Sequence, residues 1–432
     1  MRSRRAGLRN AIIGMMLLSS AGCQTYTGTR ISRRHMLAVQ GAALGSLSGP
    51  QPLRGATLED PDFLDVVLRS SSIYAVRVDS TTRASPSADQ LSASRLVRTL
   101  ESKRAIFLGE HHPDERDHLL QAALLRRLHA SRKRLAVGLE AVQRQFQPVL
   151  DDYIAGRIDE AELFTATEWE RRWYWSFEGY APIFRICREY GVQLVALDVD
   201  SEDKAKVELG GVASLDGDRL LAYVPDGDGF ERFGRTRAFE EYVAYTLRPP
   251  YTLMKRLGQK MTASTDAERT MTFTNFLARQ SLRDEAMASA SAAWLAQNPG
   301  GLLLGLVGVN HVKFACGVAA RTARMLPGGL DDVTSVLLNP TPASTFVDPM
   351  NLRLCDRTAV PNEACLQNDI EVQNYVLQLR YAAMRAGTGG RVDQAEAMQA
   401  MQAKKGSSVL ALSDYLIFSP QPAERAGLWS LR

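Results

Sequence analysis

Histidine and carboxylate residues stand directly after four short apolar runs of this sequence. The four runs are 105–108, 135–139, 194–197 and 302–307. The acidic residues and histidines that end them are Glu110 and His112, Glu140, Asp198 and Asp200, and His311. Of the six histidines in the chain, four lie in or just after these endings: His111, His112, His118 and His311. This clustering marks the endings as the candidate site.

Two kinds of chemistry need such residues. Imidazole nitrogens and carboxylate oxygens bind zinc, iron or manganese, and a further carboxylate can then act as the general base for a metal-bound water. An imidazole can instead ligate or hydrogen-bond a haem whose faces are covered by apolar and aromatic side chains. The residue types fit both sites, and no HExxH pair favours the metal.

Each residue also has a structural interpretation. Glu110 and Glu140 could cap the helices that follow them. Neighbouring residues of an extended segment point to opposite faces, so we predict a functional His112 and a structural His111. His118 fits a surface histidine as well as a ligand, whereas for His311 the functional interpretation is favoured. Asp198 and Asp200 fit either role.

The four runs predict the strands of a parallel sheet, because amphipathic helical stretches such as 117–130 separate them. We expect an α/β fold with a mostly parallel β-sheet flanked by helices. Further strands at 72–78, 333–338 and 415–419 should extend the sheet toward its edges. Parallel strands present ligand-binding loops at their carboxyl ends, so the four endings should converge there.

A helical subdomain or lid is expected at about 201–260, where the alternation of strands and helices stops. Residues 151–190 should also be helical and lie nearby. They hold a dense aromatic group: Trp169, Trp173, Tyr174, Trp175, Phe177 and Tyr180. Aromatic residues at helical spacing normally pack in a core, but they also form haem walls, and Tyr174 or Tyr180 could serve as an axial ligand.

The basic charge of the chain is concentrated in its first segment. The net charge is +4, yet residues 1–57 hold eight arginines and no acid, so the remainder is close to neutral and predicts no nucleic-acid surface. Arg33 and Arg34 precede a small-residue run at 38–49, as in a twin-arginine signal that engages an export machinery. We predict a bipartite leader over residues 1–58 that directs the chain to the thylakoid lumen of a chloroplast.

A bacterial alternative is open, because Ser20 to Cys23 could form a lipoprotein cleavage site and place the chain in a periplasm. After the leader we predict one α/β domain over 59–345 and a C-terminal extension over 346–432 that packs on it. Cys187 and Cys316 lie in apolar surroundings typical of buried, inert thiols. Cys355 and Cys365 could form a disulfide in an oxidising lumen, which the sequence leaves open.

The chain resembles ChaN-like haem-binding proteins. The Gly-Glu-His-His sequence at 109–112, with His118 six residues on, is similar to the Gly-Glu-x-His motif of that family. Further matches follow in the family's order at 138–140, 173–180, 280–288 and 308–311, so the resemblance covers about 105–326. The resemblance implies haem binding, a role in iron or haem handling and an accessory helical domain, and it allows a homodimer. The long insertion and tail resemble the version found in photosynthetic eukaryotes.

The resemblance also selects site residues. Related Tiki, TraB and erythromycin esterase proteins use similar Glu and His positions for hydrolysis, which places Glu110, His112, Glu140 and His311 in the pocket under either function. Asp284 is a further candidate that only the resemblance suggests.

Our first hypothesis is a non-enzymatic haem or tetrapyrrole-binding protein. The candidate cofactor-binding residues are His112, His311, Tyr174, Tyr180 and His118, with Glu110 and Glu140 orienting the imidazoles. The alternative is a metal-dependent hydrolase with Glu110 or Glu140 as the base. Its divalent transition metal would be held by Glu110, His112, Glu140, Asp284 and His311. A third hypothesis is an interaction module whose inherited site is inactive.

Overall fold

The computed structural model describes residues 61–77, 87–131, 134–236, 239, 242–248, 251, 271–340 and 412–419. The predicted leader lies outside these residues, as do most of the C-terminal extension and both Cys355 and Cys365. The thiols of Cys187 and Cys316 are buried, as expected. None of the described helices is long and apolar enough to cross a membrane.

The described strands form one eight-stranded sheet in the order β2-β1-β8-β7-β3-β6-β4-β5. The strands are β1 (Ser72–Arg77), β2 (Ser87–Leu91), β3 (Ala105–Glu110), β4 (Leu135–Gln143), β5 (Gln193–Asp198), β6 (Leu302–Gly308), β7 (Val333–Leu338) and β8 (Tyr415–Phe418). From β8 to β5 neighbouring strands are parallel, whereas β1 pairs antiparallel with β2 and β8. The predicted mostly parallel α/β fold is confirmed.

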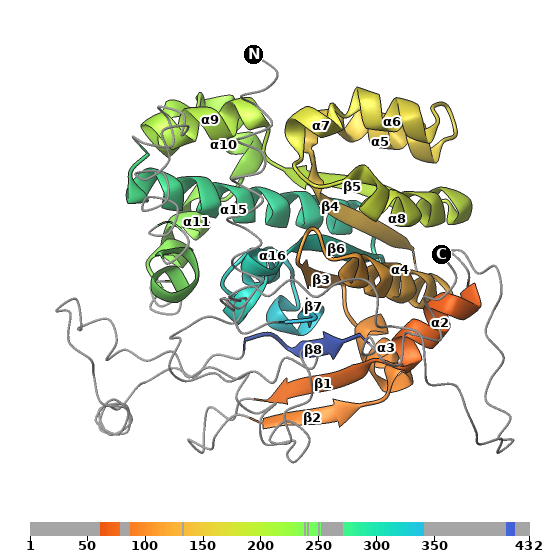
Figure 1. Cartoon of the computed structure of the whole chain (residues 1–432). Helices are drawn as coiled ribbons and strands as arrows, with labels where there is room; N and C mark the ends of the chain where they lie inside the picture. The colour runs from red at the N-terminus through yellow and green to blue at the C-terminus, as the bar shows by residue number, and fades with distance from the viewer. Residues whose placement is uncertain are drawn as a thin grey trace, which may run out of the picture.

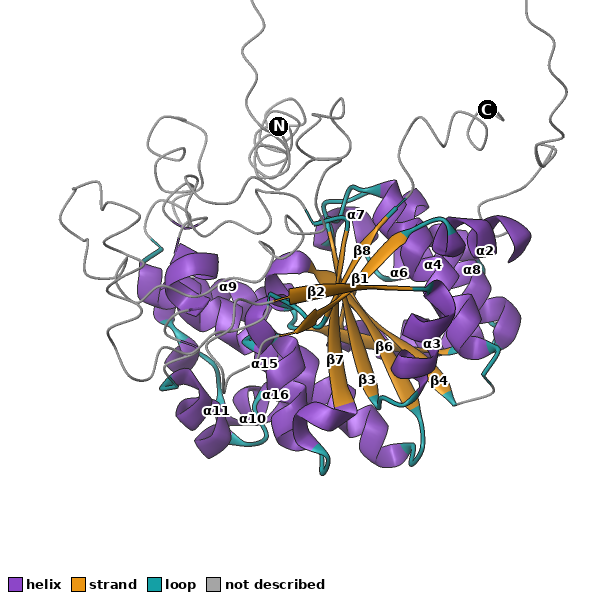
Figure 2. Ribbon diagram, turned by 90° about the horizontal axis from the view of Figure 1, so that it is seen from below, coloured by secondary structure: helices purple, strands orange, loops and turns teal. Residues whose placement is uncertain are grey.

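Helices cover both faces of the sheet (Figures 1 and 2). The α-helices on one face are α2 (Pro61–Arg69), α3 (Ala93–Glu101), α4 (Glu115–His129), α5 (Gln147–Ile154), α6 (Glu160–Ala166), α7 (Trp169–Arg172) and α8 (Phe177–Tyr190). The other face carries α15 (Phe273–Gln297) and α16 (Val318–Met325). Because both faces are covered, β3, β4, β6 and β7 are buried along their whole length, which explains the apolar runs at 105–108, 135–139 and 302–307.

The predicted helical insertion follows β5. It contains α9 (Ser201–Gly210), α10 (Gly217–Tyr223) and α11 (Gly227–Gly234), followed by the π-helical turn η3 (Val243–Leu247). Residues of α9 and α10 share a small apolar core with α15, which includes Val207, Tyr223 and Leu282. Helix α11 ends at Gly234, well before η3 begins at Val243.

Short 3-10 turns complete the described elements: η1 (Arg144–Phe146), η2 (Val212–Ser214), η4 (Val309–His311), η5 (Lys313–Ala315) and η6 (Gly329–Asp332). The strands expected at 72–78, 333–338 and 415–419 are β1, β7 and β8, and all three extend the sheet on the side of β3 away from β6, as expected. The edge strand β2 has no apolar run and was not predicted.

Candidate functional site

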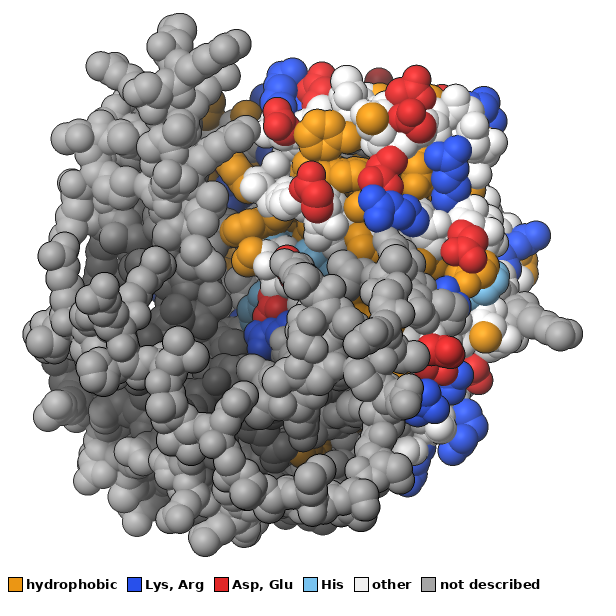
Figure 3. Space-filling view, turned by 45° about the vertical axis from the view of Figure 1, so that its right-hand side comes forward, with side chains coloured by type: hydrophobic (Ala, Val, Ile, Leu, Met, Phe, Trp, Pro, Cys, Tyr) orange, Lys and Arg blue, Asp and Glu red, His pale blue; other side chains and the backbone are white. Residues whose placement is uncertain are grey.

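The carboxyl ends of the central strands bring the predicted site residues together. Glu110 is the last residue of β3, Glu140 lies in β4, Asp198 ends β5, and His311 lies in η4 directly after β6. All four side chains are buried, although each is charged or titratable. Figure 3 shows histidine, acidic and basic side chains gathered beside hydrophobic side chains on one face of the molecule. Buried charges require partners, and these partners divide the site into two halves.

The first half is built around Glu110. Its Oε1 lies 2.8 Å from His112 Nδ1, and it also accepts hydrogen bonds from the Tyr180 hydroxyl and the Gln121 amide. His118 Nε2 lies 3.8 Å from Glu110 Oε2. Burial raises the pKa of Glu110, but the hydrogen bonds of His112 and His118 and the charge of His118 outweigh it and hold that pKa well below its ordinary value. Glu110 is therefore an ionised acceptor at neutral pH.

His112 is the imidazole of this half that reaches solvent, with 19% of its side chain exposed. Trp173 meets it edge-on at 4.9 Å between ring centroids, and Trp175 stacks on it at 5.8 Å. A Cβ on Gly308 would lie only 2.7 Å from His112 Nε2 and 3.4 Å from Glu140 Oε2. The edge of the His112 ring that carries Nε2 and Cε1 thus packs against Gly308, and only glycine leaves room for the ring there.

The second half joins His311 to two carboxylates. His311 Nδ1 lies 2.5 Å from Asp284 Oδ1, and its Nε2 lies 3.3 Å from Glu140 Oε1. Burial lowers the pKa of His311, but Glu140 and Asp284 raise it to about 9. A protonated His311 donates to both carboxylates, so the 3.2 Å approach of Arg283 Nη1 to its Nε2 is a contact between two donors and no hydrogen bond.

Arg283 fills the space between the carboxylates of this half. It donates from Nη2 to Glu140 Oε1 at 2.6 Å and from Nε to Asp198 Oδ1 at 2.8 Å. Lys204 Nζ donates to Asp198 Oδ2 at 2.7 Å. Burial raises the pKa of Glu140, but His311 and Arg283 lower it well below its ordinary value. These carboxylates are neutralised by protein cations.

Glu140, Asp198 and Asp284 already bind Arg283 or His311, which leaves fewer of their oxygens for a metal ion. Across the described residues, no group of three or more His, Cys, Asp or Glu side chains is arranged so that it could hold a metal ion. The metal-ligand set expected from the sequence, which is Glu110, His112, Glu140, Asp284 and His311, therefore stays a prediction.

Several structural interpretations are now decided. Helix α4 is capped by Asp114 and the turn η1 begins after Gln143, so neither Glu110 nor Glu140 is a helix cap. His118 is 6% exposed, so its interpretation as a surface histidine is wrong. His111 Nδ1 lies 2.9 Å from Asp117 Oδ2, in keeping with a structural role.

The two tyrosine candidates lie in different surroundings. Tyr180 is buried and donates to Glu110, and burial together with Glu110 raises its pKa well above the ordinary value, so the phenol stays protonated. Tyr174 is 61% exposed. The remaining aromatic residues pack largely as a helical core, since Trp169, Phe177 and Phe184 contact one another.

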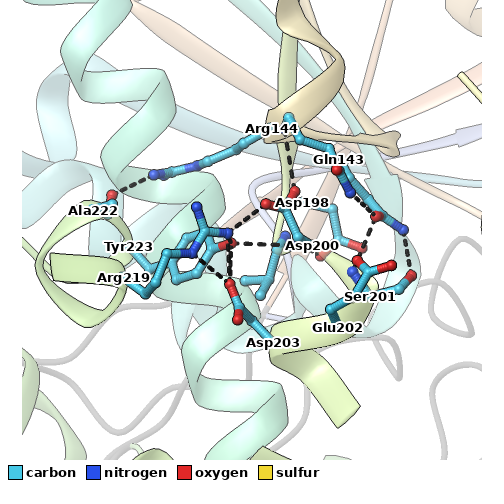
Figure 4. A network of polar contacts seen from close by, with 12 residues as sticks. Gln143, Arg144, Asp198, Asp200, Ser201, Glu202, Asp203, Arg219, Ala222 and Tyr223 are labelled. Atoms are coloured by element: carbon cyan, nitrogen blue, oxygen red, sulfur yellow. Dashed lines mark hydrogen bonds and ion pairs between the residues drawn. The ribbon is translucent and has the colours of Figure 1, made fainter. Parts of the chain in front are cut away.

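Asp200 belongs to a separate network that anchors the insertion (Figure 4). Arg219 of α10 donates to Asp200 and, from Nε at 2.7 Å, to Asp203 of α9. The Tyr223 hydroxyl donates to Asp203 at 3.0 Å, and Gln143 of β4 binds Ser201 at 2.6 Å. Asp200 therefore fastens α10 to the end of β5, which is a structural role.

Sequence reasoning did not single out Arg283, Gln121 or Lys204. Arg283 lies within the motif at 280–288, but nothing local signals that a residue of α15 reaches the ends of β4 and β5. Asp284, which only the family resemblance suggested, is 1% exposed and binds His311.

A family model described as haem-binding uptake, Tiki superfamily, ChaN matches residues 96–322. The chain belongs to the ChaN family. The matched residues include both halves of the site and the insertion, and they exclude β1, β2, β7 and β8. The resemblance inferred from the motifs is thus confirmed, and the family is a haem-binding one.

A curated relative of this ChaN-family chain is the Arabidopsis thaliana "Protein RETICULATA-RELATED 5, chloroplastic". It is 26% identical over 284 residues, which cover 63% of this chain and 35% of that protein. The chain therefore spans about a third of the length of the curated relative it matches.

Solved structures with similar folds include Campylobacter jejuni ChaN with cofacial haem binding, at 17% identity and a TM-score of 0.40, covering 62% of this chain and 91% of that one. An erythromycin esterase mutant in its open conformation has 14% identity and a TM-score of 0.38, covering 76% and 93%.

Proposed function

We propose that this chain binds haem or a related tetrapyrrole through Nε2 of His112. The observation that carries the proposal is the His112 imidazole itself, which Glu110 holds by Nδ1 while Trp173 and Trp175 line the ring and part of it reaches solvent. An imidazole fixed by a carboxylate behind it is a common arrangement for a metal or haem ligand.

Charge favours His112 over the other candidates. The ionised Glu110 keeps the proton of a neutral His112 on Nδ1, so Nε2 is left with its lone pair for iron. His311 is held as an imidazolium between Asp284 and Glu140 and has no lone pair to donate. The hydroxyl of Tyr180 is engaged with Glu110.

The remaining candidates have supporting roles in this proposal. The exposed Tyr174 stands one residue from each of the tryptophans that line His112, where it can cover a bound ligand or supply a second axial group. The His311 imidazolium and Arg283 attract anionic groups such as the carboxylates of a tetrapyrrole. His118 stabilises the charge of Glu110 from 3.8 Å.

Haem titration followed by absorbance tests the proposal. The wild-type protein should show a saturable Soret band at stoichiometric haem, and His112→Ala should lose it or shift it. His129→Ala is the matched control, because His129 ends α4 and stacks on Tyr190 instead. The absence of a saturable band in the wild type, or an unchanged band in His112→Ala, would reject the proposal.

The cellular role we infer is haem or iron handling, such as storage or delivery of a tetrapyrrole, in a plastid. The chloroplastic relative and the basic leader support a plastid, and the paired arginines support export into the thylakoid lumen. Residues 1–58 fused to a fluorescent protein should then be imported by isolated chloroplasts and appear in the lumen fraction. Replacing Arg33 and Arg34 by lysine should stop the fusion in the stroma.

We also propose that the chain divides into a core at 59–345 and a C-terminal extension at 346–432. We further propose that it forms a homodimer. The position of β8 within the sheet supports packing of the extension on the core. Light scattering with and without haem measures the oligomeric state.

A second candidate is a hydrolase, which the pairing of His112 with Glu110 favours. A carboxylate that orients an imidazole is also the arrangement of a general base. The lowered pKa of Glu110 makes that carboxylate a weak base, so His112 would accept the proton and Glu110 would orient it. Elemental analysis of the purified protein and an ester and phosphoester screen test this candidate. One transition metal per chain with turnover lost in Glu140→Gln would support the metal-dependent form.

A further inference from the structure

The strand nearest the end of the chain is joined to the candidate site by a continuous series of hydrogen bonds. We propose that Asn339 and Asp117 are positioning residues, through which strand β8 holds the backbone at His111 and so aims His112 at its ligand. This inference rests on the tetrapyrrole site proposed above. Asp117 lies within the residues that the family model matches, whereas Asn339 and strand β8 lie outside them.

Asn339, the residue after β7, fastens the end of β8. Its backbone N–H donates to Ile417 O at 2.7 Å, and its side-chain Oδ1 accepts from the Ser419 N–H at 2.8 Å. Its Nδ2 donates to Ser419 Oγ at 2.9 Å. Asn339 has a φ of 41°, a left-handed conformation that asparagine tolerates better than most residues.

The same amide continues toward the site. Asn339 Nδ2 also donates to Asp117 Oδ1 at 2.6 Å, and Asp117 lies in the first turn of α4. Its other oxygen, Oδ2, accepts from the His111 backbone N–H at 2.7 Å and lies 2.9 Å from His111 Nδ1. Asp117 is completely buried, so the loss of one of these bonds leaves a polar oxygen without compensation by water.

This series of hydrogen bonds ends at the His111 N–H, next to the proposed haem ligand His112. That N–H belongs to the peptide plane between Glu110 and His111, and the next residue is His112. Glu110 and His112 contact each other across this peptide at 2.8 Å. A rotation of the peptide plane therefore changes the direction of the His112 imidazole relative to Trp173.

The opposite end of β8 supplies a matched control. Asp414, just before β8, accepts from Thr334 Oγ1 at 3.1 Å and from the Ser335 N–H at 2.8 Å. These partners lie at the start of β7, whereas Asn339 follows its end. Asp414 thus fastens the same strand at the far end of β7, away from Asp117.

The experiment compares Asn339→Gly with Asp414→Ala in the full chain. Glycine adopts the positive φ without strain, so Asn339→Gly removes the amide alone. Both variants should unfold at a lower urea concentration than the wild type. Only Asn339→Gly should weaken haem binding, by about tenfold, as expected for a residue behind a ligand. Only Asn339→Gly should also move the imidazole signals of His111 and His112 in nuclear magnetic resonance spectra of the ligand-free protein.

These readouts separate the two proposals. A wild type that binds no haem would reject the proposed function, while the imidazole signals would still decide the role of Asn339. Equal effects of the two variants on haem affinity and on the His112 signal would overturn the inference, since β8 would then act through overall stability alone.

Discussion

Replacing His311 by glutamine should remove a pH-dependent part of the folding free energy. In the folded protein Glu140 and Asp284 raise the pKa of His311 from 6.5 to about 9. Below pH 6.5 the imidazole is protonated in both the folded and the unfolded chain, so its full contribution to stability is present. As the pH rises through 9 the folded protein loses the proton and the contribution disappears.

The expected size follows from the same values. A rise from 6.5 to about 9 corresponds to about 3 kcal/mol of unfolding free energy. Glutamine keeps a hydrogen-bonding side chain that does not titrate. The stability difference between wild type and His311→Gln should therefore be about 3 kcal/mol larger at pH 6 than at pH 10.

Urea denaturation at both pH values, with a chelator present, measures this difference. Nearby Lys313 titrates in the opposite sense, because burial lowers its pKa to about 7, but it is present in both proteins and cancels in the comparison. His129→Gln should keep the wild-type pH dependence. If the gap between wild type and His311→Gln is the same at pH 6 and pH 10, the imidazolium does not hold Glu140 and Asp284, and the charge assignment of this half is wrong.

Three further perturbations test other parts of the structure. Lys313→Met should raise the thermal unfolding midpoint, and more at pH 6 than at pH 10, because a buried ammonium is costly; circular dichroism checks it. Glu285→Ala should lower stability by about 3–5 kcal/mol in urea, since it leaves the fully buried Arg321 without that carboxylate; a loss below about 1 kcal/mol would contradict this. Gly308→Ala should weaken haem binding with a much smaller loss of stability, because the new methyl group pushes the His112 ring aside; unchanged affinity would show that the position of this ring does not decide haem binding.

The central strands were predictable because their burial on both faces requires continuous apolar runs. The runs at 105–108, 135–139 and 302–307 became the adjacent interior strands β3, β4 and β6, and the run at 194–197 became β5, which pairs with β4 at the edge of the sheet. Strand β2 has the sequence SADQL and lies at the sheet edge, where a strand needs no apolar run. The position of β8 depends on pairing with β1 and β7, which are distant in sequence, so no local pattern specifies it.

The sequence by itself determined which residue types stand at the carboxyl ends of the strands. Parallel strands all end at one edge of a sheet, so Glu110, Glu140 and His311 had to meet once the runs were read as parallel strands. Their protonation states and partners were decided by the tertiary structure. Arg283 reaches Glu140 and Asp198 only because of how α15 packs across the ends of β4 and β5. Contacts between residues so far apart in the chain depend on the packing of whole elements, and a local sequence pattern carries no information about it.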